Sequence, residues 1–136
     1  MNNVTILLVT LLCVSGCSSI SDISTDPRFS EVLGRDIPLK EQAVVCSGKP
    51  LKTGLWSFVD YELIYDEDQK GSCTFGETVG VLKIGSPIDI YEVKVHKTFG
   101  VKTASDLYFI ARSSSLGTSK QSFYISMGSL ASLIHL

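Results

Sequence analysis

Histidine is scarce in this chain, and the common catalytic and nucleotide-binding signatures are missing. The only two histidines are His96 and His135. The chain contains no GxSxG nucleophile elbow, no HExxH zinc motif, and neither GxGxxG nor GxxxxGK[ST], the glycine-rich loops that cradle phosphates. These absences exclude the usual sequence patterns of serine hydrolases, zinc peptidases and nucleotide-binding proteins. We therefore expect no catalytic residue and no cofactor.

An excess of positive charge is also lacking. The chain has 12 basic and 14 acidic residues, for a formal net charge of −2. Proteins that bind nucleic acid neutralise phosphates with clustered lysine and arginine. We therefore expect no nucleic-acid partner. The same balance argues against attraction to an anionic membrane surface by charge alone.

Residues 1–16, MNNVTILLVTLLCVSG, carry no charged side chain. Their apolar stretch at 4–14 is too short for a membrane-spanning helix, which needs roughly 20 residues. Its length is typical of the hydrophobic region of a signal peptide, and small residues follow it as a cleavage site requires. A buried N-terminal strand or helix is the alternative, but the stretch shows neither alternation nor an amphipathic stripe. We predict that residues 1–16 are an export signal.

The tetrapeptide VSGC at 14–17 resembles the lipobox of bacterial lipoproteins, in which an aliphatic residue and two small residues precede a cysteine. In that family the cysteine thiol is alkylated by a diacylglyceryl group, the preceding peptide is cut, and the new amino terminus is often acylated. The resemblance implies lipidation of Cys17 and attachment to a membrane without a transmembrane helix. Asn2 and Asn3 stand where the family usually has lysine or arginine. Ser18 stands in place of the aspartate that retains family members at the inner membrane, so the resemblance implies sorting to the outer membrane if the cell is Gram-negative.

The positions of the four cysteines are consistent with an exported protein. Cys13 lies in the predicted leader and Cys17 at the lipid site, which leaves Cys46 and Cys73. Two remaining cysteines in an oxidising compartment favour a disulfide, with two buried free thiols as the alternative. The chain has no CxxC motif and no Cys/His cluster, so we do not expect a zinc site.

Beyond the leader the chain divides into a polar, serine-rich segment at 17–25 and a single domain at 26–136. The first is typical of a flexible tether. Within the domain, Asp26 and the proline after it predict a short helix that ends at Gly34. Leucine and isoleucine at helical spacing predict a short turn or helix over 128–136.

Between these ends the pattern is that of β-strands. Apolar, β-branched and aromatic runs alternate with clusters of Gly, Ser, Pro and Asp. We expect strands over 37–46, 55–65, 78–84, 88–97, 103–112 and 120–127. The expected fold is mainly β, either a small antiparallel barrel of the SH3-like kind or a sandwich. A change of phase within 88–96 predicts a β-bulge, and the continuous apolar run at 107–111 predicts a central strand.

The segment 66–77 resembles the calcium loop of the EF-hand family over twelve residues. Acidic side chains stand at its first, third and twelfth positions and a glycine at its sixth. However, Lys70 occupies the fifth position, where an oxygen ligand belongs, and the flanking runs are strand-like. We expect an acidic hairpin turn in solvent and assign no metal ligand.

Aromatic side chains are dense in one predicted strand and give the best candidate for a partner surface. Because strands with apolar residues on both faces leave more apolar surface than one small core hides, we expect some of them at an interface. The candidates are Trp56, Phe58, Tyr61 and Tyr65.

Together these features predict a lipid-anchored envelope protein that binds another envelope protein without catalysing a reaction. An inhibitor or immunity protein against a toxin or a cell-wall hydrolase belongs to this class. One alternative is a hydrolase of peptidoglycan or lipid, which would need Asp60, Glu62 or His96 to line a cleft. The other is a structural subunit of an envelope assembly, in which a strand adds to a neighbour's sheet edge.

Overall fold

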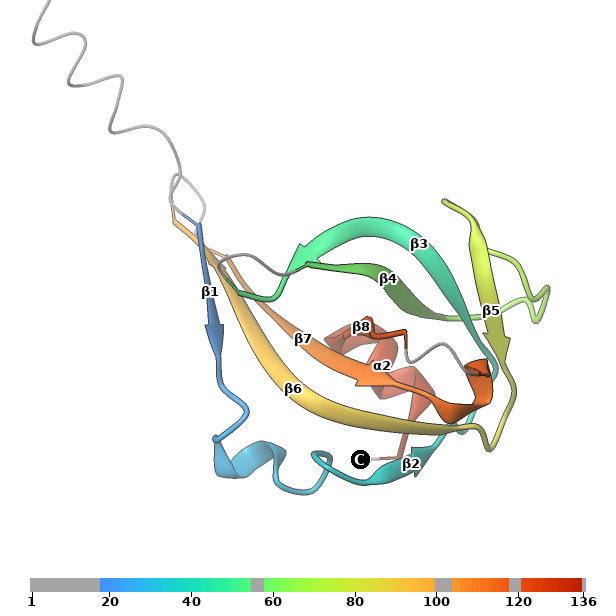
Figure 1. Cartoon of the computed structure of the whole chain (residues 1–136), viewed down its shortest axis with the longest axis horizontal. Coiled ribbons are helices and arrows are strands. Elements are labelled where there is room, and N and C mark those ends of the chain that lie inside the picture. Colours follow the sequence, from blue (N-terminus) through green and yellow to red (C-terminus); the bar gives the residue numbers. More distant parts are fainter. Residues whose placement is uncertain (1–17, 55–57, 100–103, 118–120, 136) are drawn as a thin grey trace, which may run out of the picture.

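The computed structural model describes residues 18–54, 58–99, 104–117 and 121–135, which form eight strands, two 3₁₀ helices and one short α-helix (Figure 1). In chain order these are β1 (Ser18–Asp22), η1 (Pro27–Phe29), β2 (Asp36–Pro38), β3 (Ala43–Lys52), β4 (Phe58–Tyr65), β5 (Thr78–Leu82), β6 (Pro87–Thr98), β7 (Ala104–Arg112), η2 (Ser114–Leu116), β8 (Phe123–Ser126) and α2 (Met127–Leu133). The predicted mainly β class is confirmed. No helix within these ranges is long and apolar enough to cross a membrane. The predicted leader 1–16 and Cys17 lie outside them.

The strands form one mixed sheet in the order β1-β6-β7-β8-β4-β3-β5, with β2 also paired to β6. All neighbours are antiparallel except β4 and β8, which run parallel and are joined at Glu62 and Tyr124. Among the described residues β1 and β5 stand at the two ends of the sheet and do not pair, so the sheet does not close. The fold therefore fits a sandwich-like arrangement, and the barrel that we put first is corrected. Figure 1 shows how strongly the sheet curls, with β3 and β4 on one side and β6 and β7 on the other.

Two bulges shape the long strands. The β6–β7 ladder shifts register between Ile90 and Glu92, which confirms the predicted phase change in this strand. The β3–β4 ladder shifts between Ser47 and Leu51. Here the Gly-Lys-Pro sequence, which predicts a turn, is carried inside β3 as a bulge.

Two hydrophobic clusters lie on opposite faces of the sheet. On β7, Phe109 belongs to the larger cluster and Ile110 to the smaller, because successive side chains of a strand point to opposite faces. Both are almost fully buried, and β7 lies between β6 and β8. The predicted central position of the 107–111 run is therefore confirmed.

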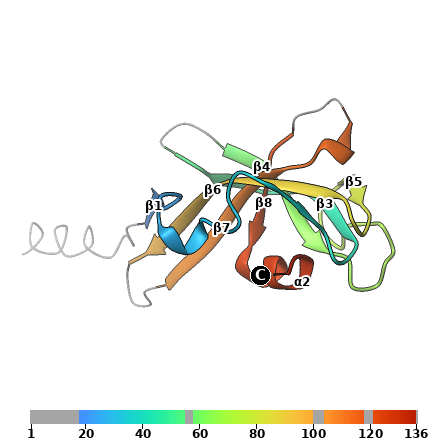
Figure 2. The same cartoon turned by 90° about the horizontal axis from the view of Figure 1, so that it is seen from below.

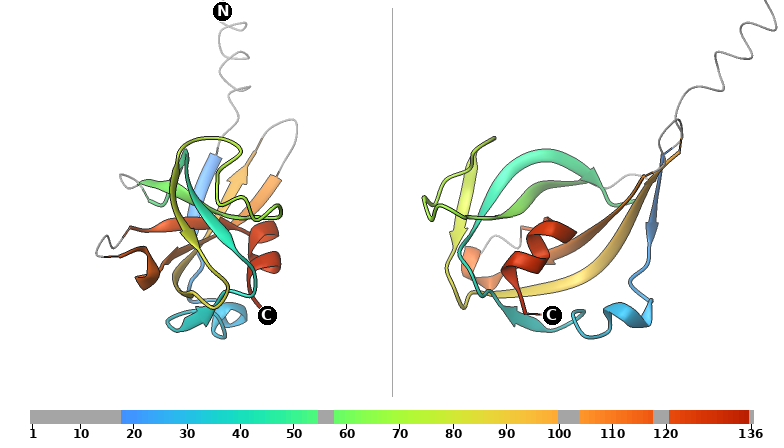
Figure 3. Two further views of the ribbon diagram at one scale, coloured as in Figure 1. Left: turned by 90° about the vertical axis from the view of Figure 1, so that its right-hand side faces the viewer. Right: turned by 180° about the vertical axis from the view of Figure 1, so that it is seen from behind.

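Helix α2 covers the larger cluster and packs against β4, β7 and β8 (Figures 2 and 3). Ser126 caps its N-terminus, with its hydroxyl accepting the Ser129 amide. The side chains that the helical spacing selects are all buried, namely Leu130, Leu133 and Ile134. The short helix predicted at the C-terminal end is thus present, and it closes the core.

The segment predicted as a tether is a strand over part of its length. Residues 18–22 form β1, which pairs antiparallel with β6 from Ser18–Thr98 to Asp22–Lys94. The Asp22 carboxylate accepts a hydrogen bond from Lys94 Nζ at 3.0 Å, and the Lys94 side chain is nearly buried. Backbone pairing and this ion pair, which join residues far apart in the chain, order a polar segment that has no apolar pattern of its own.

We expect the docking of β1 to weaken in acid. Hydrogen bonds from the Ser24 hydroxyl and amide, with a further contribution from Lys94, lower the pKa of Asp22 to about 2. A carboxylate with a lowered pKa stabilises the folded state above its ordinary pKa of 3.8, and this contribution is lost as the pH falls through 2. Because half of the Asp22 side chain is exposed, the loss should stay under about 1 kcal/mol.

The measurement is the thermal unfolding midpoint of the full chain in detergent at pH 5, 3 and 2, for the wild type and Asp22→Asn. The variant should lose less stability than the wild type on acidification. Equal losses in the two proteins would show that Asp22 does not hold β1 through its charge.

Candidate functional site

The disulfide that the cysteine count predicts is present between Cys46 and Cys73, with a Cα–Cα separation of 5.9 Å. Cys46 is buried in β3, and Cys73 lies in the loop between β4 and β5. The bridge therefore fastens this loop to the sheet. Gly76 brings the loop back beside β3 with a φ of +78°, where a Cβ atom would overlap the carbonyl oxygen of Ser47.

The acidic segment 66–77 uses its first carboxylate for its own fold. Asp66 accepts hydrogen bonds from Gln42 Nε2 at 2.7 Å, the Gly71 amide at 2.8 Å and the Lys70 amide at 3.1 Å. The bond from Gln42 is the main cause of its lowered pKa. Lys70 Nζ lies 2.7 Å from a carboxylate oxygen of Asp68. Within the described ranges, no three His, Cys, Asp or Glu side chains are placed to hold a metal ion.

The described aromatic residues of the predicted partner surface differ in their surroundings. Trp56 lies outside the described residues. Phe58 is 58% exposed, whereas Tyr61 and Tyr65 pack against the larger hydrophobic cluster. Phe58 is the first residue of β4, whereas the two tyrosines lie further along the strand, where it packs against the larger cluster. Of the described candidates, Phe58 is therefore the one that stands open to solvent.

The acidic residues of β4 and the β6 histidine line neither of the two cavities described below. Glu62 is bonded within the fold, because Tyr124 donates its hydroxyl to the Glu62 carboxylate at 3.1 Å. Burial raises the pKa of Tyr124, and the nearby Glu62 charge adds to the effect. His96 pairs across the ladder with Asp106. One cavity, of about 580 Å³, lies beneath the acidic loop and includes the disulfide.

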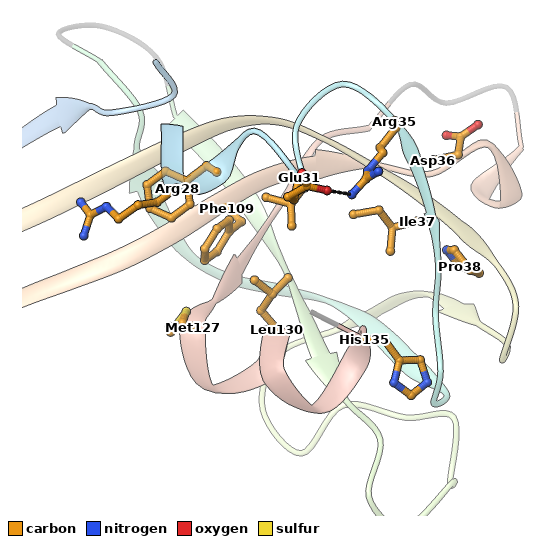
Figure 4. A pocket seen from close by; sticks show the side chains of 12 residues that line it. Arg28, Glu31, Arg35, Asp36, Ile37, Pro38, Phe109, Met127, Leu130 and His135 are labelled. Carbon is orange, nitrogen blue, oxygen red and sulfur yellow. Dashed lines mark hydrogen bonds and ion pairs between the residues drawn. The ribbon is translucent and has the colours of Figure 1, made fainter. Parts of the chain in front are cut away.

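The other cavity is a cleft of about 660 Å³ between the η1–β2 segment and α2 (Figure 4). Such a volume lies within the range of small-molecule binding sites. The residues that line it are Arg28, Phe29, Glu31, Val32, Arg35, Asp36, Ile37, Pro38, Phe109, Met127, Leu130 and His135. We call it the η1–α2 cleft, and it is the candidate functional site.

One wall of the cleft is built by the local sequence around η1. Asp26 caps the 3₁₀ helix by accepting the Arg28 amide at 3.0 Å, and Pro27 occupies its first turn. The predicted N-terminal helix is therefore this short 3₁₀ turn, followed by a turn that ends at Gly34, where φ is +72°. The Gly34 amide donates to the carbonyl of Ile90 at 3.0 Å, which fastens the wall to β6.

The floor and the facing wall come from β7 and α2. Phe109 forms the floor and packs edge-to-face on Phe29, with ring centroids 5.9 Å apart. Leu130 stands beside it and is almost fully buried. Met127 lies at one end of the cleft and His135 towards the other, as Figure 4 shows. Met127 is 46% exposed, so a large flexible apolar side chain stands open to solvent at the edge of the cleft.

Both arginines that line the cleft have carboxylate partners, one of which, Asp26, lies outside the lining. Arg28 Nη2 lies 2.6 Å from the Asp26 carboxylate, and Arg35 Nη2 lies 3.1 Å from that of Glu31. Hydrogen bonding to Arg28 lowers the pKa of Asp26 to about 2, and the same contact raises the pKa of Arg28. Since both arginines already have carboxylate partners, the cleft offers apolar surface more than it offers charge.

Sequence reasoning finds only part of this site. The apolar face of the segment after Asp26 is visible in the sequence, but it is typical of ordinary packing. Met127 and His135 carry no signal that connects them with residues a hundred positions earlier. Only the fold places the two ends of the domain on either side of Phe109.

No protein-family model, no curated protein and no solved structure matches this chain. The functional interpretation of the cleft therefore depends on its own residues and their chemistry.

Proposed function

We propose that this chain is a lipid-anchored protein of the bacterial envelope that binds another envelope protein and does not catalyse a reaction. In this proposal an apolar side chain of the partner enters the η1–α2 cleft. The observation that carries it is the apolar lining of the cleft, in which both arginines already have carboxylate partners. An inhibitor or immunity protein is the role we expect within this class.

The anchor is the lipid that the lipobox resemblance implies for Cys17. Two or more acyl chains hold a protein firmly to a bilayer, whereas a single chain binds reversibly. Ser18, the next residue, already belongs to β1 and pairs with Thr98. Lipidation at Cys17 would therefore hold this end of the sheet close to the membrane. We place the protein at the outer membrane if the cell is Gram-negative, because Ser18 follows the cysteine.

The cleft suits an apolar side chain better than an anionic small molecule. A phosphate or carboxylate ligand would have to compete with Asp26 and Glu31 for Arg28 and Arg35. An apolar group displaces no such bond, and it gains about 25 cal/mol for each Å² of apolar surface removed from water. A methionine at the edge adapts to side chains of different shape.

Site-specific photo-crosslinking in living cells tests this function. A photoreactive amino acid replaces Met127 in the full chain, and we expect one discrete adduct with a second protein. The same residue at Phe58, which is more exposed than Met127, is the control and should give no such adduct. A probe at His135 should give the same adduct as the probe at position 127. Met127→Glu, combined with the probe at His135, should lower the yield of that adduct at least tenfold.

Three results would contradict the proposal. These are no adduct from either cleft position, the same adducts from the cleft and from Phe58, or an unchanged yield in Met127→Glu. An adduct from Phe58 alone would return the partner site to the strand that the sequence first indicated.

A further inference from the structure

Strand β5 is an open end of the sheet. It stands last in the strand order and pairs only with β3 among the described residues. Its sequence, TVGVL, contains neither a charge nor a proline. Val79 and Val81 are 41% and 39% exposed. Natural proteins usually protect an edge strand with charge, proline or a covering segment, because an unprotected edge pairs with another strand.

The opposite end of the sheet does carry such protection. β1 is polar and ends in Asp22, and β2 contains Asp36 and Pro38. β5 carries neither charge nor proline, and its ladder with β3 shifts register between Val45 and Cys46. Figure 1 places β5 on the side of the molecule away from β1, so this edge also lies away from the proposed lipid anchor.

The two ends of β5 carry opposite charges. Glu77 immediately precedes the strand and Lys83 immediately follows it, and both are exposed. Neither takes part in an ion pair among the residues that the structure describes. Antiparallel pairing brings the start of one strand beside the end of the other. Two copies of β5 would therefore place each Glu77 beside the Lys83 of the other copy.

The centre of the strand is also suited to self-pairing. The sequence reads Val-Gly-Val around Gly80, so two antiparallel copies set valine near valine on both sides of a two-fold axis. Leu116 of η2 covers the Gly80 position, where its Cδ2 lies 2.6 Å from the place of a Cβ atom. The exposed valines on either side of Gly80 are the apolar part of the edge.

From these observations we propose that two copies of this chain dimerise by antiparallel pairing of their β5 edges. The pairing is two-fold symmetric and uses the open edge of each copy, so it closes at a dimer. With the two-fold axis at Gly80, Val79 faces Val81 of the other copy and Glu77 faces Lys83. The proposal does not depend on lipidation or on the η1–α2 cleft.

The interface is small, since it consists of one short strand and its exposed side chains. Stable dimers usually bury more than about 1,000 Å², so we expect a weak association that depends on concentration. Because charge pairs at its ends contribute, it should weaken further as salt is raised. Confinement of both copies to one membrane would raise their effective concentration.

Charge reversal with mutual rescue tests the proposal. Two full-length copies with different tags are co-expressed, extracted in detergent at low salt, and assayed for co-purification. In E77K both opposing ends become basic, and in K83E both become acidic. Each variant should pair with itself about tenfold less than the wild type does, because two attractive pairs become repulsive. A mixture of E77K with K83E restores both ion pairs and should recover wild-type co-purification.

Glu67→Lys is the matched control, because it reverses an exposed acidic residue in the loop before β5 and should leave pairing unchanged. Rescue in the mixture cannot come from misfolded chains, so a folding defect does not imitate the expected result. Absence of wild-type co-purification would overturn the proposal. Equal co-purification in every combination would overturn it as well, because it would reflect shared micelles instead of β5 pairing.

Discussion

Cys17→Ala is expected to abolish lipid attachment completely. The wild-type product should lack residues 1–16, should carry the mass of a thioether-linked diacylglyceryl group, and should enter the detergent phase on phase separation. In the lipoprotein family cleavage follows alkylation of the cysteine, so the variant should keep its leader and its unmodified mass. Intact-mass spectrometry of the extracted protein is the decisive measurement.

Cys13→Ala is the matched control for this experiment. It removes a thiol from the same segment, four residues earlier, but that thiol leaves with the leader in our proposal. Its product should therefore have the wild-type mass and the wild-type detergent partition. If Cys17→Ala yields the same mass and partition as the wild type, the lipid anchor is wrong. The cleft and the β5 edge would remain to be judged by their own experiments.

Removal of the Cys46–Cys73 bridge should cause the largest loss of stability. The bridge joins residues 27 positions apart. In the chain-entropy description of disulfides, closing a loop of this size stabilises the folded state by about 3.5 kcal/mol. Domains are usually stable by only about 5–15 kcal/mol, so the loss is a large share of the total. The measurement is the free energy of unfolding in urea for the wild type and Cys73→Ala.

Cys73→Ala is preferred to a change at position 46 because Cys46 is almost fully buried and its truncation would also disturb packing. The wild type in reducing buffer is the control, and its unfolding curve should coincide with that of Cys73→Ala. A loss below about 1 kcal/mol would mean that the hydrogen bonds of the acidic loop, centred on Asp66, hold the loop without the bridge.

The two proposals concern different surfaces: partner binding uses the η1–α2 cleft, and dimerisation uses the β5 edge. The cleft presents apolar side chains within a concave site, and it accepts a partner by burial of apolar area. The edge presents backbone groups between Glu77 and Lys83, and it accepts a strand. A Met127 variant should therefore leave dimerisation unchanged, and E77K should leave the crosslink at the cleft unchanged. If each variant affects only its own assay, partner binding and dimerisation use separate surfaces.

The acidic loop illustrates how a sequence motif and a fold diverge. Carboxylates and a glycine at calcium-loop spacing are present in 66–77. In the structure the Asp66 carboxylate accepts hydrogen bonds from two backbone amides and from the Gln42 side chain, and Lys70 forms an ion pair with Asp68. The spacing that resembles a metal site thus also builds a compact turn, because a carboxylate accepts amide hydrogen bonds as readily as it binds a cation.

The sequence by itself determined the elements whose cause is local. Alternation and turn residues located β4 to β8, whereas the run expected as one strand over 37–46 is divided between β2 and β3. The phase change located the β6 bulge, and helical spacing located the C-terminal helix. Counting the cysteines left Cys46 and Cys73 as the pair. Each of these depends on neighbouring residues or on simple elimination, so no knowledge of the fold was needed.

The tertiary structure decided what depends on distant partners. The polar segment 18–22 became β1 because β6 supplies its hydrogen bonds and Lys94 its counter-charge. The aromatic residues of β4 were divided between core and solvent by the sheet that formed around them. The cleft arose because both ends of the domain fold onto Phe109, and the β5 edge stayed open because the curled sheet stops before it closes. Surfaces of this kind are made by the packing of elements far apart in sequence, and only the folded chain brings them together.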